Sequence, residues 1–132
     1  MKKLIPFAAL ILIASSCTFY DVEPRYDDRN NFVGYYDVEE YSETFKDLTY
    51  YEIRISKSRY DREIYIDNFY AADLRVYAIV SFDDIRIPFQ VVDGYEIEGT
   101  GTFYRGELTL NYRVLDLYDN SGADYCETVA WR

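Results

Sequence analysis

The chain has 132 residues, a formal charge of −10 at pH 7 and no histidine, and it contains 16 tyrosines. The absence of histidine excludes Ser-His-Asp and Cys-His hydrolases, as well as zinc or haem sites with histidine ligands. The excess of acidic side chains repels polyanions, so nucleic acid is excluded as a partner.

The N-terminal segment has the parts of an export signal. Two lysines precede an apolar run that ends at Ala14 and is too short to span a bilayer, and small residues lead into Cys17. This arrangement resembles the lipobox of bacterial lipoproteins, which implies cleavage after Ser16 and diacylation of Cys17. The alternative is an ordinary secretory signal with Cys17 as a spare thiol. Both interpretations predict export.

Three regions follow from this interpretation. Residues 1–16 are predicted to be a lipoprotein signal peptide, residues 17–31 the lipidated cysteine with an acidic tether, and residues 32–132 one folded domain. The tether is polar and charged, and it shows neither helical nor strand periodicity. The predicted location is the bacterial outer membrane, which the protein contacts through the lipid on Cys17.

From Phe32 onward, short runs rich in β-branched and aromatic residues alternate with turn residues, a pattern typical of strands. Such short segments leave no room for a sizeable helix. Eight strands are predicted, at residues 32–38, 48–57, 62–69, 74–82, 85–92, 95–99, 107–117 and 123–131.

The middle of the domain shows the clearest strand pattern, because every second residue of 74–82 and of 85–91 is apolar. Asp93-Gly94 is a pair typical of a type I′ hairpin, so the fourth to sixth strands are predicted to form an antiparallel meander. Pro88 cannot donate a ladder hydrogen bond, which predicts an edge or a bulge in the fifth strand. The change of apolar face near Val114 predicts a bulge or an edge crossing in the seventh strand.

Short connections between successive strands favour an up-and-down sheet, and closure of that sheet removes its exposed edges. The predicted fold is all-β: an eight-stranded antiparallel meander closed, or nearly closed, into a small barrel of the lipocalin-like or calycin kind. A two-sheet sandwich of the same strands is the alternative.

Several strand and turn motifs carry a family resemblance, at residues 28–38, 51–58, 66–69, 85–90, 97–101 and 108–114. Their order resembles that of small uncharacterised lipoproteins of Bacteroidota, which implies the fold and provides no catalytic residue. Many members of that group have a cysteine after the first strand that could pair with one near the C-terminus. Residues 39–42 of this chain contain no cysteine. The chain departs from the group there, and this departure removes the disulfide that the resemblance would imply for Cys126.

Cys126 is the remaining thiol once Cys17 is acylated. Activation of a thiol requires a nearby base or cationic surroundings, whereas Tyr125 and Glu127 flank this one. We expect a buried, inert side chain, with a redox or intermolecular role as the alternative.

Carboxylates are the remaining candidates for chemistry. Aspartates at predicted turns offer oxygen ligands that suit calcium, but none has the spacing of an EF-hand loop and turn preference explains them. They are Asp83, Asp84, Asp93, Asp116, Asp119 and Asp124, with Asn120. Paired carboxylates could hydrolyse glycosides, yet any acidic domain offers such pairs by chance. The sequence therefore predicts no metal site, no cofactor and no enzymatic activity.

Tyrosines occur on both phases of the early strands, so some rings face outward or line a barrel mouth. Exposed rings can stack on sugars or anchor a protein interface, whereas cross-strand packing is the alternative explanation. Tyr36, Tyr51 and Tyr65 are the candidate ligand-binding residues.

The predicted function is a lipid-anchored, non-catalytic binding or structural module of the cell envelope that engages a protein, a glycan or a small apolar ligand. The alternative is an envelope enzyme with paired carboxylates, or an enzyme inhibitor. An apolar cavity favours a small ligand and a filled barrel favours a macromolecule, whereas two buried, converging carboxylates in a cleft favour catalysis.

Overall fold

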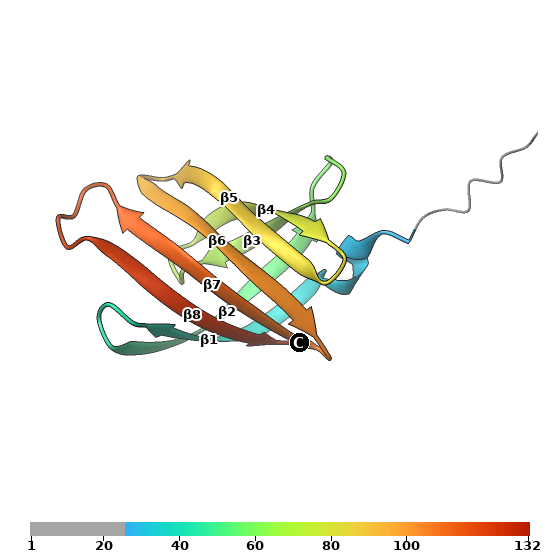
Figure 1. The fold of residues 1–132 in the computed structure, drawn as a ribbon, viewed down its shortest axis with the longest axis horizontal. Coiled ribbons are helices and arrows are strands. Elements are labelled where there is room, and N and C mark those ends of the chain that lie inside the picture. The colour runs from blue at the N-terminus through green and yellow to red at the C-terminus, as the bar shows by residue number, and fades with distance from the viewer. Residues whose placement is uncertain (1–25) are drawn as a thin grey trace, which may run out of the picture.

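The computed structural model describes residues 26–132, which form an eight-stranded antiparallel β-barrel (Figure 1). A short 3-10 helix, η1 (Asp28–Asn31), precedes the first strand. The strands are β1 (Gly34–Ser42), β2 (Asp47–Lys57), β3 (Glu63–Phe69), β4 (Leu74–Ser81), β5 (Asp84–Val92), β6 (Tyr95–Tyr104), β7 (Glu107–Asp116) and β8 (Ala123–Trp131). The predicted signal peptide and Cys17 lie outside the described residues.

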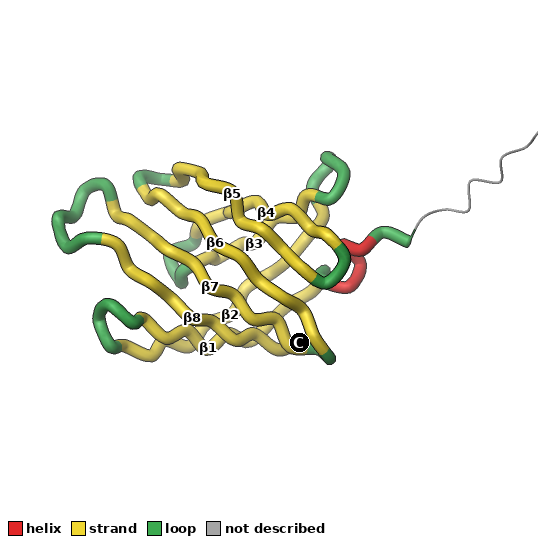
Figure 2. Tube along the Cα trace, viewed as in Figure 1, coloured by secondary structure: helices red, strands yellow, loops and turns green. Residues whose placement is uncertain are grey.

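Each strand pairs with its neighbour in the chain, and β1 also pairs with β8, so the sheet closes on itself. Strands make up most of the domain, and short loops connect them at its two ends (Figure 2). Closure pairs the edges that an open sheet would expose. The predicted all-β meander barrel is therefore confirmed, and the alternative sandwich is wrong.

The start of the domain differs from the prediction. Residues 28–31, which the sequence assigns to the tether, form η1, and β1 begins at Gly34 and runs to Ser42. Arg29 holds η1 in place, because its Nη1 donates to the backbone oxygens of Ser58, Tyr60 and Glu63 at 3.0, 2.9 and 3.1 Å. These contacts are long-range, so strand or helix periodicity cannot reveal them.

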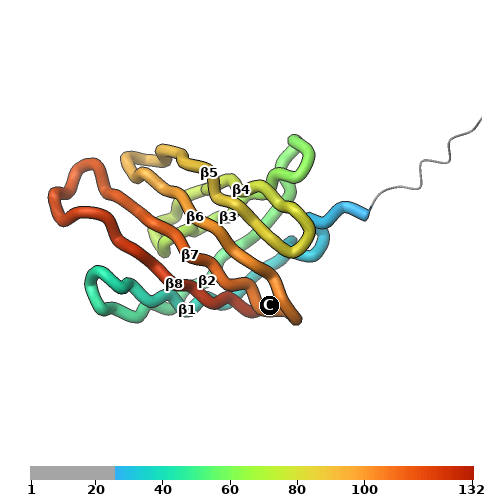
Figure 3. The backbone as a smooth tube through the Cα atoms, in the orientation of Figure 1, coloured from blue at the N-terminus to red at the C-terminus, as the bar shows by residue number. Residues whose placement is uncertain are grey.

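The turns gather at the two ends of the barrel (Figure 3), and the side chains at these ends differ. We call the end next to η1 the closed end. There the buried ring of Phe32 packs against Phe103, and the backbone oxygen of Phe32 accepts a hydrogen bond from the hydroxyl of Tyr36. The Arg132 guanidinium lies 5.1 Å from the Phe103 ring centre. The opposite end, called the mouth, carries the turns that follow β1, β3, β5 and β7.

Apolar side chains on the inward phase of the strands fill the closed half of the barrel. They are buried almost completely, as expected for a close-packed interior. They include Ile55, Ile64, Val80, Ile85, Leu108 and Ala130. In the described part of the chain, no helix has the length and hydrophobicity needed to cross a membrane.

The turn between β5 and β6 has the predicted geometry, since Asp93 and Gly94 have φ angles of 48° and 83°. Pro88 also lies at a predicted irregularity, because the pairing of β5 with β6 shifts between Ile87 and Gln90. The side-chain amide of Gln90 then bonds to both backbone groups of Tyr77 on β4, at 3.0 and 2.9 Å. It thereby replaces a missing strand contact.

The irregularity predicted near Val114, a bulge or an edge crossing, is wrong. The register of β7 is continuous with both β6 and β8 through this residue. Leu115 remains on the outer phase, where a half-buried apolar side chain is tolerated. The other shift is between β3 and β4, next to Asn68, whose φ is 64°.

Strand β6 continues to Tyr104, beyond its predicted end at Gly99. Gly99 and Gly101 lie on the inward phase, where a Cβ at Gly99 would come within 2.5 Å of the Cβ of Tyr112. A Cβ at Gly101 would lie 2.4 Å from Cδ2 of Leu110. The glycines therefore make room for large inward side chains of β7. Glycine usually weakens a strand interior, so the sequence gives no local signal that the strand continues through these two positions.

We expect Gly99→Ala to lower the free energy of unfolding by about 1–3 kcal/mol, because the new methyl group would meet atoms that cannot move aside easily. Urea unfolding followed by circular dichroism measures this change. Thr100→Val, on the exposed outer phase of the same strand, is the control and should change stability by less than about 0.5 kcal/mol. Equal effects of the two substitutions would contradict this account of β6.

Candidate ligand site at the mouth of the barrel

The inward phase of the strands becomes polar toward the mouth. Along β1, the inward residues change from Tyr36 and Val38 to Glu40 and Ser42, all of them buried. Closure of the barrel places these beside inward residues of β8 and β7. We call the resulting group the inner polar cluster; it comprises Glu40, Ser42, Tyr51, Tyr70, Tyr112, Asp124 and Cys126.

Glu40 lies at the centre of the inner polar cluster and is only 5% exposed. Its Oε2 accepts hydrogen bonds from the hydroxyls of Tyr51 and Tyr112, which come from strands on both sides of the interior. Burial, together with the nearby carboxylate of Asp124, raises the pKa of Glu40 to about 7. Glu40 therefore retains its proton at mildly acidic pH, where an exposed glutamate is ionised.

Asp124 is the second buried carboxylate and is 4% exposed. Its Oδ1 accepts the hydroxyl of Ser42 at 2.5 Å, and its Oδ2 accepts the hydroxyl of Tyr70. Burial, and then the bond to Asp124, raises the pKa of Tyr70. The two carboxylates are therefore held by neutral hydroxyl donors.

Cys126 lies between these groups and is buried, as the sequence predicts. Burial, followed by the proximity of Glu40 and Asp124, raises the pKa of its thiol, because a thiolate here would face two acidic neighbours. Thr128 of β8 is the register partner of Glu40. Its buried hydroxyl has no hydrogen-bond partner within the described residues.

A hollow of about 220 Å³ opens above the inner polar cluster. We call it the mouth hollow; it is lined by Phe45, Tyr70, Tyr95, Val114, Asp116, Asp119, Ser121, Gly122 and Asp124. The rings of Tyr70 and Tyr95 have centres 6.3 Å apart and planes inclined by 63°, and Tyr70 also meets Tyr112 edge to face at 6.4 Å. Aromatic rings thus connect the hollow with the cluster beneath it.

The aspartates of the mouth hollow also shape its loop. Asp116 Oδ1 accepts the backbone N–H of Tyr118 at 2.9 Å, and Asp119 accepts the backbone N–H and the hydroxyl of Ser121 at 3.2 and 3.0 Å. Turn formation therefore accounts for part of this acidic group, as predicted from turn preference. Among residues 26–132, no group of three or more acidic or cysteine side chains is placed to hold a metal ion.

The three tyrosines chosen from the sequence occupy different places. Tyr36 is buried at the closed end, where its hydroxyl donates to Phe32. Tyr51 belongs to the inner polar cluster. Tyr65 lies on the outer phase, with the Arg75 guanidinium 4.8 Å from its ring centre. Tyr51 does not line the mouth hollow, and the structure does not bring the three tyrosines together.

Glu40 and Tyr112 are the functional candidates that sequence reasoning missed. The strand pattern could have indicated both, because each lies on the same phase of its strand as buried apolar residues and therefore points inward. Asp124 is grouped with the turn aspartates in the sequence, but it is the second residue of β8 and faces the interior. Which inward groups meet depends on how the barrel closes.

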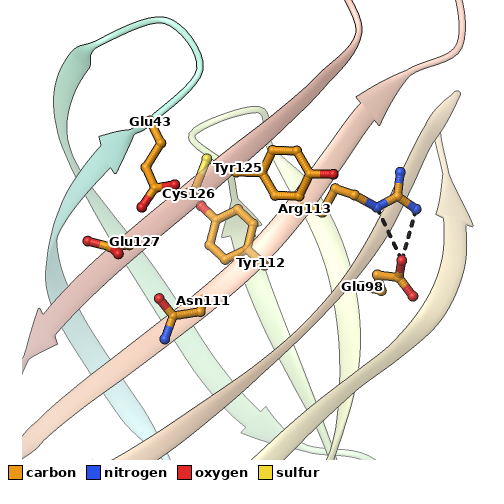
Figure 4. Close-up of a pocket in the computed structure, with 8 residues that line it drawn as sticks. All are labelled: Glu43, Glu98, Asn111, Tyr112, Arg113, Tyr125, Cys126 and Glu127. Atoms are coloured by element: carbon orange, nitrogen blue, oxygen red, sulfur yellow. Dashed lines mark hydrogen bonds and ion pairs between the residues drawn. The ribbon is translucent and has the colours of Figure 1, made fainter.

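A larger open groove, about 470 Å³, lies on the outer face of β7 and β8 (Figure 4). Arg113 is paired there with Glu98 at 3.0 Å, and Tyr125 pairs with Arg113 in the strand register. A hydrogen bond with Glu43 raises the pKa of Glu127. These acidic side chains are exposed to water, so they need no ligand to offset their charge. The mouth hollow, with its buried carboxylate, is the stronger candidate site.

No protein-family model matches this sequence, and no curated protein is significantly similar to it. The barrel is compatible with a lipocalin-like fold. The resemblance to Bacteroidota lipoproteins stays a prediction.

The raised pKa of Glu40 predicts a pH-dependent stability. The folded-state pKa of about 7 exceeds the usual 4.5, so the stabilising contribution is complete below about pH 4.5 and is lost as pH rises to 7. By linkage, the loss amounts to about 3 kcal/mol. We expect Glu40→Gln to remove this part of the pH dependence of the urea midpoint between pH 4.5 and 8.

Glu52→Gln provides the matched control, since Glu52 is exposed on the outer phase of β2 and the same charge is removed. The pH dependence of this variant should equal that of the unaltered protein. If Glu40→Gln also left the pH dependence unchanged, Glu40 would not hold a proton in the folded state.

Proposed function

We propose that this protein is a lipid-anchored module of the bacterial cell envelope whose barrel binds a small ligand in the mouth hollow. The observation that carries the proposal is a concave site where a buried carboxylate, Asp124, meets the aromatic walls of Tyr70 and Tyr95. Aromatic walls with convergent polar groups are found at ligand sites, and the polar share is large in this hollow because three aspartates line it. At about 220 Å³, the hollow suits a ligand smaller than most drugs.

The position of the hollow agrees with the proposed anchor. The chain reaches the barrel through η1 at the closed end, whereas the β7–β8 loop and the other mouth turns lie at the far end (Figure 1). A lipid on Cys17 would therefore tether the closed end to the membrane. The mouth would then face away from the bilayer and be open to solutes.

Binding is favoured over catalysis by the positions of the two carboxylates. Asp124 lines the mouth hollow, whereas Glu40 lies deeper and is not among the lining residues. A glycosidase needs two carboxyl groups that both reach the scissile bond. Although Glu40 and Asp124 are buried and close enough to interact, a ligand in the hollow would meet only one of them. We therefore propose a non-catalytic role.

The anchor has a direct test in cells. We expect Cys17→Ala to abolish metabolic labelling with palmitate and to release the protein from the membrane fraction, because the acylated side chain would be missing. Cys126→Ala is the control and should be labelled and fractionated normally. A labelled Cys17→Ala protein would refute lipidation at this residue.

Ligand binding has a second test by NMR on the purified full-length protein, titrated with a fragment set of small alcohols, acids and amines. We expect amide shifts at the mouth turns, and about tenfold weaker binding in Tyr95→Ala because one aromatic wall is lost. Tyr104→Ala, an exposed tyrosine at the closed end, should bind normally. Shifts confined to the outer groove around Tyr125 would contradict the proposal.

A further inference from the structure

The charges and rings of the mouth hollow specify the kind of ligand that fits it. We infer that the mouth hollow binds an organic ammonium group, a proposal that rests on the function proposed above. Three observations support it: a buried carboxylate without a counter-ion, two inclined aromatic rings beside it, and an acidic rim free of basic side chains.

The first observation is that the buried carboxylate of Asp124 has no cationic partner among the described residues. Asp124 is almost fully buried, and its hydrogen bonds come from the hydroxyls of Ser42 and Tyr70. The ion pairs found among residues 26–132 join Asp27 to Arg29 and Lys57, Asp67 to Arg75, and Glu98 to Arg113, so none includes an aspartate of the hollow. A buried carboxylate is costly without a cation nearby, and a bound ammonium group would provide one.

The second observation concerns the aromatic rings that line the hollow. The faces of tyrosine and phenylalanine rings carry negative potential and attract cations, most strongly where water is displaced. Tyr70 and Tyr95, whose ring planes are inclined by 63°, both line the hollow, and so does the partly exposed Phe45. Rings on several sides suit an alkylated or primary ammonium group, whose C–H or N–H groups can contact them.

A metal ion fits this site less well. Calcium takes six to eight oxygen ligands, whereas the described residues contain no acidic group arranged to hold a metal. Two carboxylates of the hollow, Asp116 and Asp119, are also occupied in part by turn hydrogen bonds. The hollow therefore favours an organic cation over a divalent metal.

Glu40 gives the site a second measurable property. It faces Asp124 and Cys126 from β8, Tyr51 from β2 and Tyr112 from β7, and Tyr112 contacts Tyr70 of the hollow. A cation beside Asp124 would offset the negative charge that helps to keep Glu40 protonated. Binding near neutral pH should therefore release a fraction of a proton, and affinity should rise with pH.

The test is isothermal titration calorimetry of the full-length protein at pH 7 with choline chloride and with its neutral isostere, 3,3-dimethyl-1-butanol. We expect choline to bind at least about tenfold more tightly. In two buffers of different ionisation enthalpy, choline binding should release protons, and Glu40→Gln should bind choline without this release.

Asp116→Asn should weaken choline binding, because one carboxylate of the hollow loses its charge, whereas Asp83→Asn provides the same charge change at the closed end and should have no effect. Equal binding of the isostere would overturn the ammonium inference and leave small-ligand binding intact. Binding of calcium chloride but not of choline would overturn it in favour of a metal. No binding of any probe, with no NMR shifts at the mouth, would overturn both proposals.

Discussion

Closure of the sheet between β1 and β8 is the constraint on which the rest of this structure depends. Closure surrounds every inward side chain with other side chains. The interior of an eight-stranded barrel is just wide enough for side chains to fill it. Residues far apart in the sequence, such as Ser42 and Cys126, become register partners through this seam. The glycines of β6 and the amide of Gln90 adapt the sheet locally, so that closure accommodates the ring of Tyr112 and the bulge at Pro88.

The interior is divided between apolar packing at the closed end and hydrogen-bonded polar groups near the mouth. A barrel that needed only stability would gain from apolar residues in both halves, because burying carboxylates costs more than their hydrogen bonds return. Here Glu40 and Asp124 are satisfied by phenolic and aliphatic hydroxyls, without a positive charge among their donors. Such an arrangement is typical of a site where stability is reduced in favour of function.

The two ends of the barrel therefore have separate roles in our proposal. The closed end holds η1 through Arg29 and receives the chain from the proposed anchor, whereas the mouth presents a small acidic and aromatic hollow on the opposite side. The hollow is continuous with the inner polar cluster through Tyr70 and Tyr112, and in our proposal the charge of a bound ligand is therefore coupled to the protonation of Glu40.

The sequence by itself determined the number of strands, their order and the antiparallel meander, because period-2 alternation and turn residues are local properties. It favoured a barrel over a two-sheet sandwich, and the pairing of β1 with β8 decided between them. It also indicated the bulge at Pro88 and the burial of Cys126. It did not determine the course of η1, the extension of β6 through its glycines or the meeting of Glu40, Tyr112 and Asp124. Only the tertiary structure decided these, because a strand pattern shows which side chains point inward, whereas strand register and barrel closure decide which of them touch.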